Sequence, residues 1–354
     1  MNILYLITGL GGGGAERVVV DLADQMVLRG HQVKIAYLKG QEIVIHPYQQ
    51  KIELVYLGLE SPFQFLSAAY KYNQLIKLFK PDIVHAHMVH ANIFARLNRL
   101  FSKIPKLICT AHSNNEGGKI RMLAYHYTNR LSDVNTNVSK KATDDFIRKR
   151  AFDQNAITVY NGIDLSKFSV INQKKNDDST KIILAVGRLN TQKDYPNLLQ
   201  AISLIHIEKK IDFKLLIAGE GEERENISYL IQELNLDSYV ELLGRRNDIP
   251  ELMAKADIFV LSSTFEGFGL VVAEAMACKT FVVATDCGGV KEVMGGYGLL
   301  VPPKAPKDLA QAICKALLMS TEEQRLNNQK ALEYVQQNFD LSKIVGKWIE
   351  LYES

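Results

Sequence analysis

The 354-residue sequence has few cysteines and no long hydrophobic run. Its four cysteines, Cys109, Cys278, Cys287 and Cys314, are far apart and form no Cys-x-x-Cys pair. We therefore expect reduced, buried thiols rather than disulfides or a metal site. No apolar run approaches the roughly 18–20 residues that a membrane-spanning helix needs. Residues 3–7 are too short for the core of a signal peptide and lack a basic flank. These absences favour a cytoplasmic globular protein.

The overall charge of +3 hides an uneven distribution. Residues 1–170 contain 21 Lys and Arg against 13 Asp and Glu, whereas residues 171–354 contain 21 against 26. The basic residues of the first half lie in groups with aromatic residues close by. These are Lys71, Lys77, Lys80, Arg96, Arg99, Lys103, Lys106, Arg148, Lys149 and Arg150, with Phe63, Phe65, Tyr70, Tyr72, Phe79, Phe94 and Phe101. Such a face suits an anionic membrane surface at the cytoplasmic side; a solvated surface over core aromatics is the alternative. No nucleic-acid motif accompanies the charge.

Short apolar, β-rich runs alternate with helical patterns along both halves of the chain. Such alternation is typical of parallel sheets covered by helices on both faces. We predict an α/β protein with two doubly wound, Rossmann-like domains, residues 1–170 and 171–340, facing across a cleft. Residues 172–180 are polar and read as the linker, and a final helix in 341–354 could pack back on the first domain. Ligands bind outside the carboxyl ends of such strands, so we expect the site in the cleft.

A glycine-rich loop, Gly9 to Gly14, follows the first predicted strand and precedes a helix. Exposed N–H groups and the positive end of that helix favour an anion-binding loop; a flexible turn is the alternative. The loop formally matches G-x-G-x-x-G. However, the second strand ends in Leu38-Lys39-Gly40 without the acidic residue of a dinucleotide site, which argues against a nicotinamide cofactor. The Walker pattern is also absent.

Two strand-end segments of the second half are candidates for ligand binding, and the first contains possible phosphate ligands. Arg188 and Lys193 lie between the strand Ile182–Val186 and the next helix. Cations at a helix start oppose the helix dipole, which favours a diphosphate clamp over two ordinary surface cations. Gly219-Glu220-Gly221 follows another strand, either as a turn shaped around a ligand or as an ordinary turn.

A third segment combines a glycine-rich loop with a short apolar helix. Glu266 lies in the loop, and the backbone N–H groups of Gly269, Leu270 and Val271 begin the helix, which makes a second anion site. Glu274 lies about one turn further on in the apolar helix. A buried carboxylate must be paired or hydrogen-bonded, and ribose hydroxyls would satisfy it. A core Glu paired with a structural Arg is the alternative.

Together these segments resemble glycosyltransferase family 4, whose members are retaining, nucleotide-sugar-dependent enzymes of GT-B fold. The resemblance rests on Gly-Gly-Ala-Glu near the start, Asn161-Gly162-Ile163-Asp164, the Arg188 and Lys193 segment, Gly219-Glu220-Gly221, and the two glutamates that flank seven residues. It covers essentially the whole chain, and the glutamate pair is its specific part.

The resemblance implies a role for each matching residue. It implies that Arg188 and Lys193 hold the donor diphosphate and that Glu274 binds the ribose. Glu266 and the backbone of Phe268, Gly269 and Leu270 would then meet the donor sugar. It also implies that the loop of Gly12, Gly13 and Gly14 approaches the diphosphate and that His112 lies near the transferred sugar. Arg245, beside Arg246, would lie in the segment that usually recognises the base.

The chemistry implied is transfer without a metal ion or other cofactor. No two aspartates are separated by one residue, so the Asp-x-Asp metal ligands of GT-A enzymes are missing. Fixed cations and helix N-termini would stabilise the leaving diphosphate instead. His85 and His87, two apart on a predicted strand, are conceivable metal ligands, but hydrogen bonding is the simpler interpretation.

We therefore expect a retaining glycosyltransferase that uses a nucleotide sugar, UDP-hexose or UDP-N-acetylhexosamine by prevalence. The acceptor would be lipid-linked or a saccharide, in bacterial surface polysaccharide synthesis at the inner face of the membrane. A sugar-nucleotide epimerase of the same fold and a non-catalytic nucleotide-sugar-binding regulator are the alternatives. The first would turn over donor alone, and the second would bind donor without transfer or hydrolysis.

Overall fold

The computed structural model describes residues 1–40, 43–114, 116–168, 180–208 and 211–354. It divides into two compact units: Met1–Gly162 with Leu341–Ser354, and Ile163–Asp340. The division falls at Gly162, eight residues before the expected boundary, and the expected linker at 172–180 lies almost wholly outside the described residues. Because Leu341–Ser354 belong to unit 1, the chain returns to its first unit at the end.

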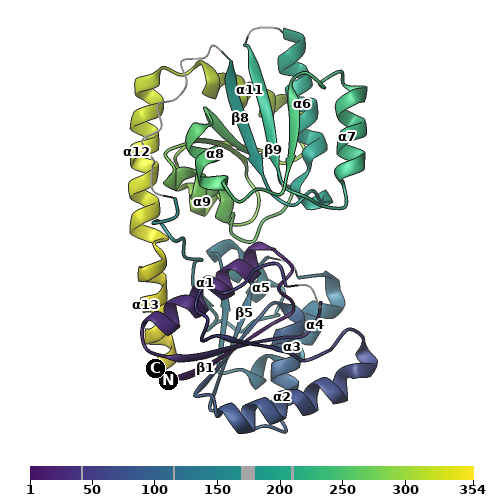
Figure 1. Ribbon diagram of the computed structural model, residues 1–354, viewed down its shortest axis with the longest axis vertical. Coiled ribbons are helices and arrows are strands. Elements are labelled where there is room, and N and C mark those ends of the chain that lie inside the picture. Colours follow the sequence, from purple (N-terminus) through teal and green to yellow (C-terminus); the bar gives the residue numbers. More distant parts are fainter. Residues whose placement is uncertain (41–42, 115, 169–179, 209–210) are drawn as a thin grey trace. The chain divides into compact units, whose positions relative to one another are not determined.

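Unit 1 is a doubly wound sheet of seven parallel strands in its described part, in the order β3-β2-β1-β4-β5-β6-β7 (Figure 1). The strands are β1 Asn2–Ile7, β2 Gln32–Tyr37, β3 Glu53–Tyr56, β4 Ile83–His87, β5 Lys106–Ala111, β6 Val134–Asn137 and β7 Ile157–Thr158. The helices are α1 Gly14–Leu28, α2 Phe65–Phe79, α3 Val89–Asn98, α4 Gly118–Thr128, α5 Lys140–Arg148 and α13 Leu341–Glu353, with short 3-10 turns at Pro62–Gln64 and Asn129–Leu131.

The central strand β1 is buried on both faces, which explains its continuous apolar sequence. Ile3, Tyr5 and Ile7 point into the layer that contains α1 and α13, whereas Leu4 and Leu6 point into the layer of α2 and α3. In α13, Trp348 and Tyr352 are among the buried residues, and the Tyr352 hydroxyl lies 3.1 Å from that of Tyr5. The final helix is thus a structural part of unit 1, beside α1 (Figure 1).

Unit 2 repeats the plan with six parallel strands in its described part, in the order β10-β9-β8-β11-β12-β13. The strands are β8 Lys181–Val186, β9 Phe213–Ala218, β10 Val240–Gly244, β11 Ile258–Leu261, β12 Phe281–Thr285 and β13 Leu299–Val301. The helices are α6 Tyr195–Glu208, α7 Arg224–Glu233, α8 Ile249–Lys255, α9 Leu270–Ala277, α10 Val290–Met294, α11 Pro306–Leu318 and α12 Thr321–Asn338, with a 3-10 turn at Thr191–Lys193. The expected fold class is therefore confirmed for each unit.

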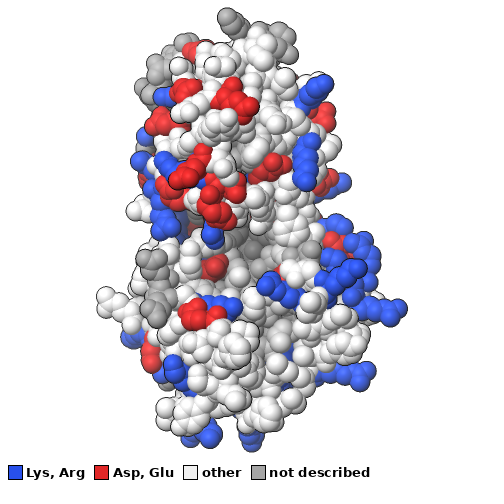
Figure 2. All heavy atoms as spheres, turned by 90° about the vertical axis from the view of Figure 1, so that its right-hand side faces the viewer, with Lys and Arg blue, Asp and Glu red and all other residues white. Residues whose placement is uncertain are grey.

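The charge asymmetry follows the structural units. On the face drawn in Figure 2, Asp and Glu gather over unit 2, and a group of Lys and Arg lies at one edge of unit 1. The aromatic residues near the basic groups are divided. Phe63, Tyr70 and Phe101 are exposed, but Tyr72 and Phe94 are core residues.

Arg96 is the clearest correction to the expected basic surface. It is fully buried, donates to the side chains of Thr128 and Asn135, and lies 5.1 Å from the ring centroid of Tyr125. At this position the expected basic face is therefore wrong, because the side chain belongs to the core of unit 1. No helix in the described ranges combines the length and hydropathy needed to cross a bilayer.

Candidate active site

The predicted donor ligands of unit 2 follow the carboxyl ends of adjacent strands. The strand order β10-β9-β8-β11-β12 places the loops of Arg245, Gly219, Arg188 with Lys193, and Glu266 side by side. Backbone hydrogen bonds join the first three loops: Gly219 donates to Gly244 (2.8 Å), and Gly187 donates to Ala218 (3.0 Å). The sheet topology thus brings together segments that lie up to 78 residues apart in the sequence.

The geometry of Gly219 and Gly221 has an internal explanation. Gly219 has a φ of +152°, and a Cβ there would lie 1.9 Å from the carbonyl oxygen of Gly187. A Cβ at Gly221 would lie 2.2 Å from the carbonyl oxygen of Leu189. Both glycines are therefore required where the loop after β9 packs against the loop after β8, as in the ordinary-turn interpretation.

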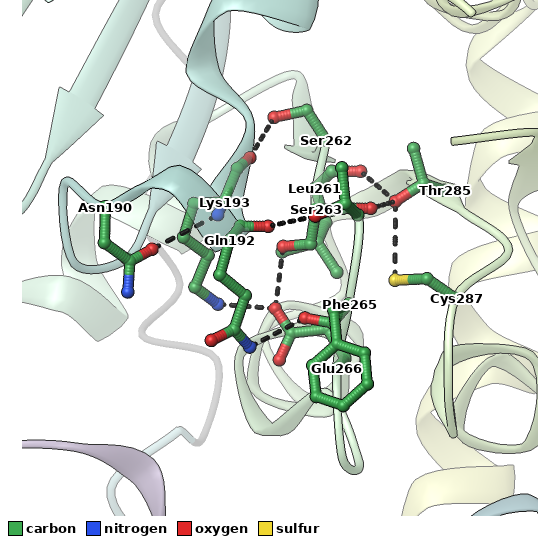
Figure 3. Close-up of polar contacts among 12 residues, drawn as sticks. Asn190, Gln192, Lys193, Leu261, Ser262, Ser263, Phe265, Glu266, Thr285 and Cys287 are labelled. Carbon is green, nitrogen blue, oxygen red and sulfur yellow. Dashed lines mark hydrogen bonds and ion pairs between the residues drawn. The ribbon is translucent and has the colours of Figure 1, made fainter. Parts of the chain in front are cut away.

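Lys193 and Glu266 form the centre of the candidate site (Figure 3). Lys193 Nζ lies 2.6 Å from Glu266 Oε1, and the Ser263 hydroxyl donates to the same oxygen (2.7 Å). The two charged side chains are only 16% and 11% exposed. A charge pair this far from water gains strength from the low dielectric, and its desolvation must be offset by these hydrogen bonds.

The loop that contains Lys193 is bound to the loop that contains Glu266. Gln192 Nε2 donates to the Phe265 carbonyl (2.7 Å), and the Ser262 hydroxyl donates to the Lys193 carbonyl (2.8 Å), as Figure 3 shows. Asn190 caps the short 3-10 turn by accepting the Lys193 N–H (3.2 Å). Lys193 therefore has a fixed backbone as well as a fixed side chain.

Gly288 is a residue of this site that the sequence reasoning missed. It follows β12 with a φ of +57°, and a Cβ there would lie 1.6 Å from the Glu266 carbonyl oxygen. The loop after β12 therefore packs directly on the backbone that presents Glu266. The pair Gly288-Gly289 just after an apolar strand was the available signal.

The remaining predicted residues of unit 2 are arranged as follows. Arg188 is exposed and pairs with Glu222, 3.1 Å away. This ion pair is separate from the pair of Lys193 and Glu266. Arg245 is exposed, and its neighbour Arg246 pairs with Asp248. These side chains lie at the surface, while the Lys193 and Glu266 pair is inside.

The helix α9 begins at Leu270, as expected, with Gly269 at φ +97° before it. The first backbone donor to Gly269 is Val272, so the N–H groups of Leu270 and Val271 precede the helix's own hydrogen-bond ladder. Phe268 is buried against Phe339, which leaves only its backbone for a ligand. Glu274 is half-buried and has an interaction partner.

In unit 1, residues 11–14 of the predicted anion loop are exposed at the start of α1, whereas Leu10 is buried. Gly12 has a φ of +99°, Gly13 is the N-terminal cap of α1, and Gly14 is the first helical residue. The loop therefore has the arrangement in which backbone N–H groups meet an anion.

His112 follows β5 directly and is half-buried. Its Nε2 lies 3.0 Å from His87 Nδ1 on the neighbouring strand β4, and burial lowers the pKa of His112 to about 4. His85 is fully engaged with the hydroxyls of Tyr352 and Thr110, each 2.7 Å away. In the described part of the chain, no group of His, Cys, Asp or Glu is arranged to hold a metal ion. The four cysteines are free thiols, three of them buried.

Comparison with known proteins identifies the family. The model of "Glycosyltransferase Family 4" matches residues 12–167, and that of "Glycosyl transferases group 1" matches residues 166–332. The chain is 32% identical over 352 residues to the N-acetylgalactosamine-N,N'-diacetylbacillosaminyl-diphospho-undecaprenol 4-alpha-N-acetylgalactosaminyltransferase of Campylobacter jejuni, with 92% of each chain covered. The chain belongs to glycosyltransferase family 4.

Other similarities agree with this assignment. The enzyme is 29% identical to the N-acetyl-alpha-D-glucosaminyl L-malate synthase of Bacillus anthracis, with 96% of this chain and 93% of the relative covered. Among solved structures, Anabaena Alr3699/HepE in complex with UDP-glucose superposes with a TM-score of 0.86 at 22% identity, covering 100% of this chain and 99% of that one. The last similarity concerns the fold alone, which is GT-B.

Proposed function

We propose that this glycosyltransferase moves an N-acetylhexosamine or hexose from a UDP-sugar to a lipid-linked acceptor, with retention and without a metal ion. The observation that supports it best is the enclosed Lys193 ammonium at the carboxyl end of the unit 2 sheet, paired with Glu266 in the loop before α9. The Campylobacter jejuni relative is named for transfer to a diphospho-undecaprenol acceptor, and Anabaena Alr3699/HepE was solved with UDP-glucose.

The proposed chemistry concerns the bond between the sugar and the diphosphate. When that bond breaks, negative charge grows on the leaving β-phosphate. Lys193 and Arg188 supply positive charge, and the N–H groups at the start of α9 and of the Gly12–Gly14 loop supply oriented dipoles. Glu274 is proposed to bind the ribose, Glu266 the sugar, Gly219 and Arg245 the surroundings of the base, and His112 the transferred sugar.

The experiment is a transfer assay with purified enzyme, a panel of UDP- and GDP-sugars, and undecaprenyl-diphosphate-linked saccharides. We expect product only when both substrates are present, no loss of rate in EDTA, and an α-linked product from an α-linked donor. Turnover of donor alone would instead indicate the epimerase, and binding without turnover would indicate the regulator.

We further propose that the enzyme works at the inner membrane surface through α4. The exposed side of this helix carries Ile120, Leu123 and Tyr127, which are 83%, 52% and 79% exposed and lie on one stripe. Lys119 and Arg121 are exposed beside them. An apolar stripe flanked by cations matches an anionic bilayer surface. Sequence reasoning did not single out this helix, whose buried residues are Met122 and Tyr125.

The membrane proposal is tested by flotation with vesicles of phosphatidylglycerol and phosphatidylethanolamine. The triple variant Ile120→Ser, Leu123→Ser, Tyr127→Ser should stay at the bottom of the gradient, whereas the unchanged enzyme should float and be released by salt. The matched control replaces three exposed apolar residues of unit 2 by Ser, namely Ile207, Tyr229 and Leu318. Equal flotation of all three proteins would contradict the proposal.

A further inference from the structure

Glu116 lies four residues after His112 and has no role in the chemistry described so far. Its Oε1 accepts the backbone N–H of His112 (2.7 Å), and its Oε2 accepts the hydroxyl of Tyr125 (2.5 Å). The side chain therefore connects the turn that contains His112 to the buried side of α4.

The partner of Glu116 is itself fixed in the core of unit 1. Tyr125 is fully buried, and its hydroxyl also accepts a hydrogen bond from Asn92 Nδ2 (2.9 Å). The same Asn92 nitrogen donates to the carbonyl of Thr110, in β5, two residues before His112 (2.9 Å). The Arg96 guanidinium lies over the Tyr125 ring. The hydrogen bonds therefore run from Glu116 through Tyr125 and Asn92 to Thr110, and both ends of this series lie next to His112.

The ring of His112 has a contact of its own in addition to the one that holds its backbone. His112 Nε2 lies 3.0 Å from His87 Nδ1, and the described residues place no hydrogen-bond partner at Nδ1 of His112. The position of Nδ1, the other ring nitrogen, therefore depends on both the backbone contact with Glu116 and the ring contact with His87.

The two contacts of Glu116 match the ionised form of its carboxyl group. A carboxylate is an acceptor only, and each of its oxygens here receives one donor; a protonated carboxyl would bring a third hydrogen to the same place. Burial raises the pKa of Glu116 to about 7. The charged and titratable groups that face it are His112 after β5, Arg121 and Tyr125 of α4, and Arg96 of α3, and the two arginines favour its ionised form.

We propose that ionised Glu116 is a positioning residue that holds His112 in place for sugar transfer. The proposal rests on the function proposed above, in which His112 meets the transferred sugar. Protonation or removal of the carboxylate frees the His112 N–H and the turn that follows, and the ring nitrogen then loses its position. Displacement of a contact group by about 1 Å can cost about 100-fold in rate.

The test compares Glu116→Gln with Asp133→Asn. Asp133 is a matched control because it accepts a backbone N–H at the other end of the same strand, from Leu107 (2.7 Å). We expect Glu116→Gln to fold and to lower kcat about 10-fold or more, with the KM for the donor changed much less. The unchanged enzyme should lose kcat as the pH falls through about 7, and this acid limb should be absent in Glu116→Gln. An unchanged kcat and pH profile in Glu116→Gln would overturn the proposal.

A second measurement separates this proposal from the proposed function. The backbone amide resonance of His112, followed by NMR, should shift with an apparent pKa near 7 in the unchanged protein and in Asp133→Asn, but not in Glu116→Gln. If no combination of donor and acceptor gives product, the proposed function is wrong. If the His112 amide does not titrate, the Glu116 proposal is wrong, whatever the transfer assay shows. Asp133→Asn should retain both kcat and the acid limb.

Discussion

Lys193 Nζ and Glu266 Oε1 lie 2.6 Å apart, although the two residues are 73 positions apart in the sequence. The ammonium group is held by a carboxylate inside the domain rather than extended into solvent. The resemblance assigns one of these residues to the donor diphosphate and the other to the donor sugar. Under those proposed roles, the ion pair would link the diphosphate part of the donor site to the sugar part.

Replacing Lys193 by Met should abolish transfer and also destabilise the protein. Removing one partner of an enclosed ion pair leaves the other charge unpaired, which costs about 3 kcal/mol. The double variant Lys193→Met, Glu266→Gln should regain most of the free energy of unfolding in urea while remaining inactive. Activity in the single variant would contradict the assignment of Lys193 to the diphosphate.

Arg188→Ala should separate binding from stability. The Arg188 side chain is 68% exposed and its partner Glu222 is 56% exposed, so solvent screens their pair and it contributes little to folding. We expect an unchanged melting temperature without ligand but a smaller thermal shift on addition of UDP. Glu222→Gln is the control, since it frees Arg188 and should preserve or increase that shift. Equal thermal shifts in all three proteins would show that Arg188 does not contribute to UDP binding.

Gly288→Ala should inactivate the enzyme by displacing Glu266. The new Cβ would meet the Glu266 carbonyl oxygen at 1.6 Å, so one of the two loops must move. The control is Gly296→Ala, also at positive φ (+90°) but with open space around the Cβ, which should cost only the roughly 1–2 kcal/mol of left-handed strain. Transfer rates and melting temperatures of both variants check this. Similar kcat values would show that the Gly288 contact does not position Glu266.

The buried imidazoles should make unit 1 sensitive to acid. Burial lowers the pKa of His85, His87 and His112 below 6.5, so on acidification the unfolded chain binds protons that the folded protein does not. The free energy of unfolding should therefore fall as the pH drops from about 6.5 towards 4, by about 1.4 kcal/mol per pH unit for each extra proton.

Glu116 acts in the opposite direction over the same interval. Its pKa is raised from 4.5 to about 7, so the folded protein retains a proton that the unfolded chain has lost. The three imidazoles outnumber it. Urea unfolding at several pH values should give a steeper acid destabilisation in Glu116→Gln and a shallower one in His112→Asn. Stability that rises on acidification from pH 6.5 would contradict the burial of neutral imidazoles.

Much of the architecture could be predicted because it depends on local patterns. The alternation of apolar runs and helical periodicities was sufficient for two parallel sheets. The predicted strand Ile182–Val186 differs from β8 by one residue, and the predicted helix start agrees with that of α9 at Leu270. The motifs could be expected to meet, since the carboxyl ends of parallel strands share one edge of a sheet.

Which side chains form an ion pair or hydrogen bond depends on three-dimensional packing, which local sequence patterns do not specify. The sequence by itself determined the fold of each unit, the family and the strand ends after which the motifs lie. Only the tertiary structure decided that Lys193 pairs with Glu266 while Arg188 faces Glu222, and that Arg96 is buried. It also decided that Glu116 holds His112. The physical reason is that burial and the few ångströms between side chains set the strength of an ion pair or hydrogen bond, and both are properties of the packed chain.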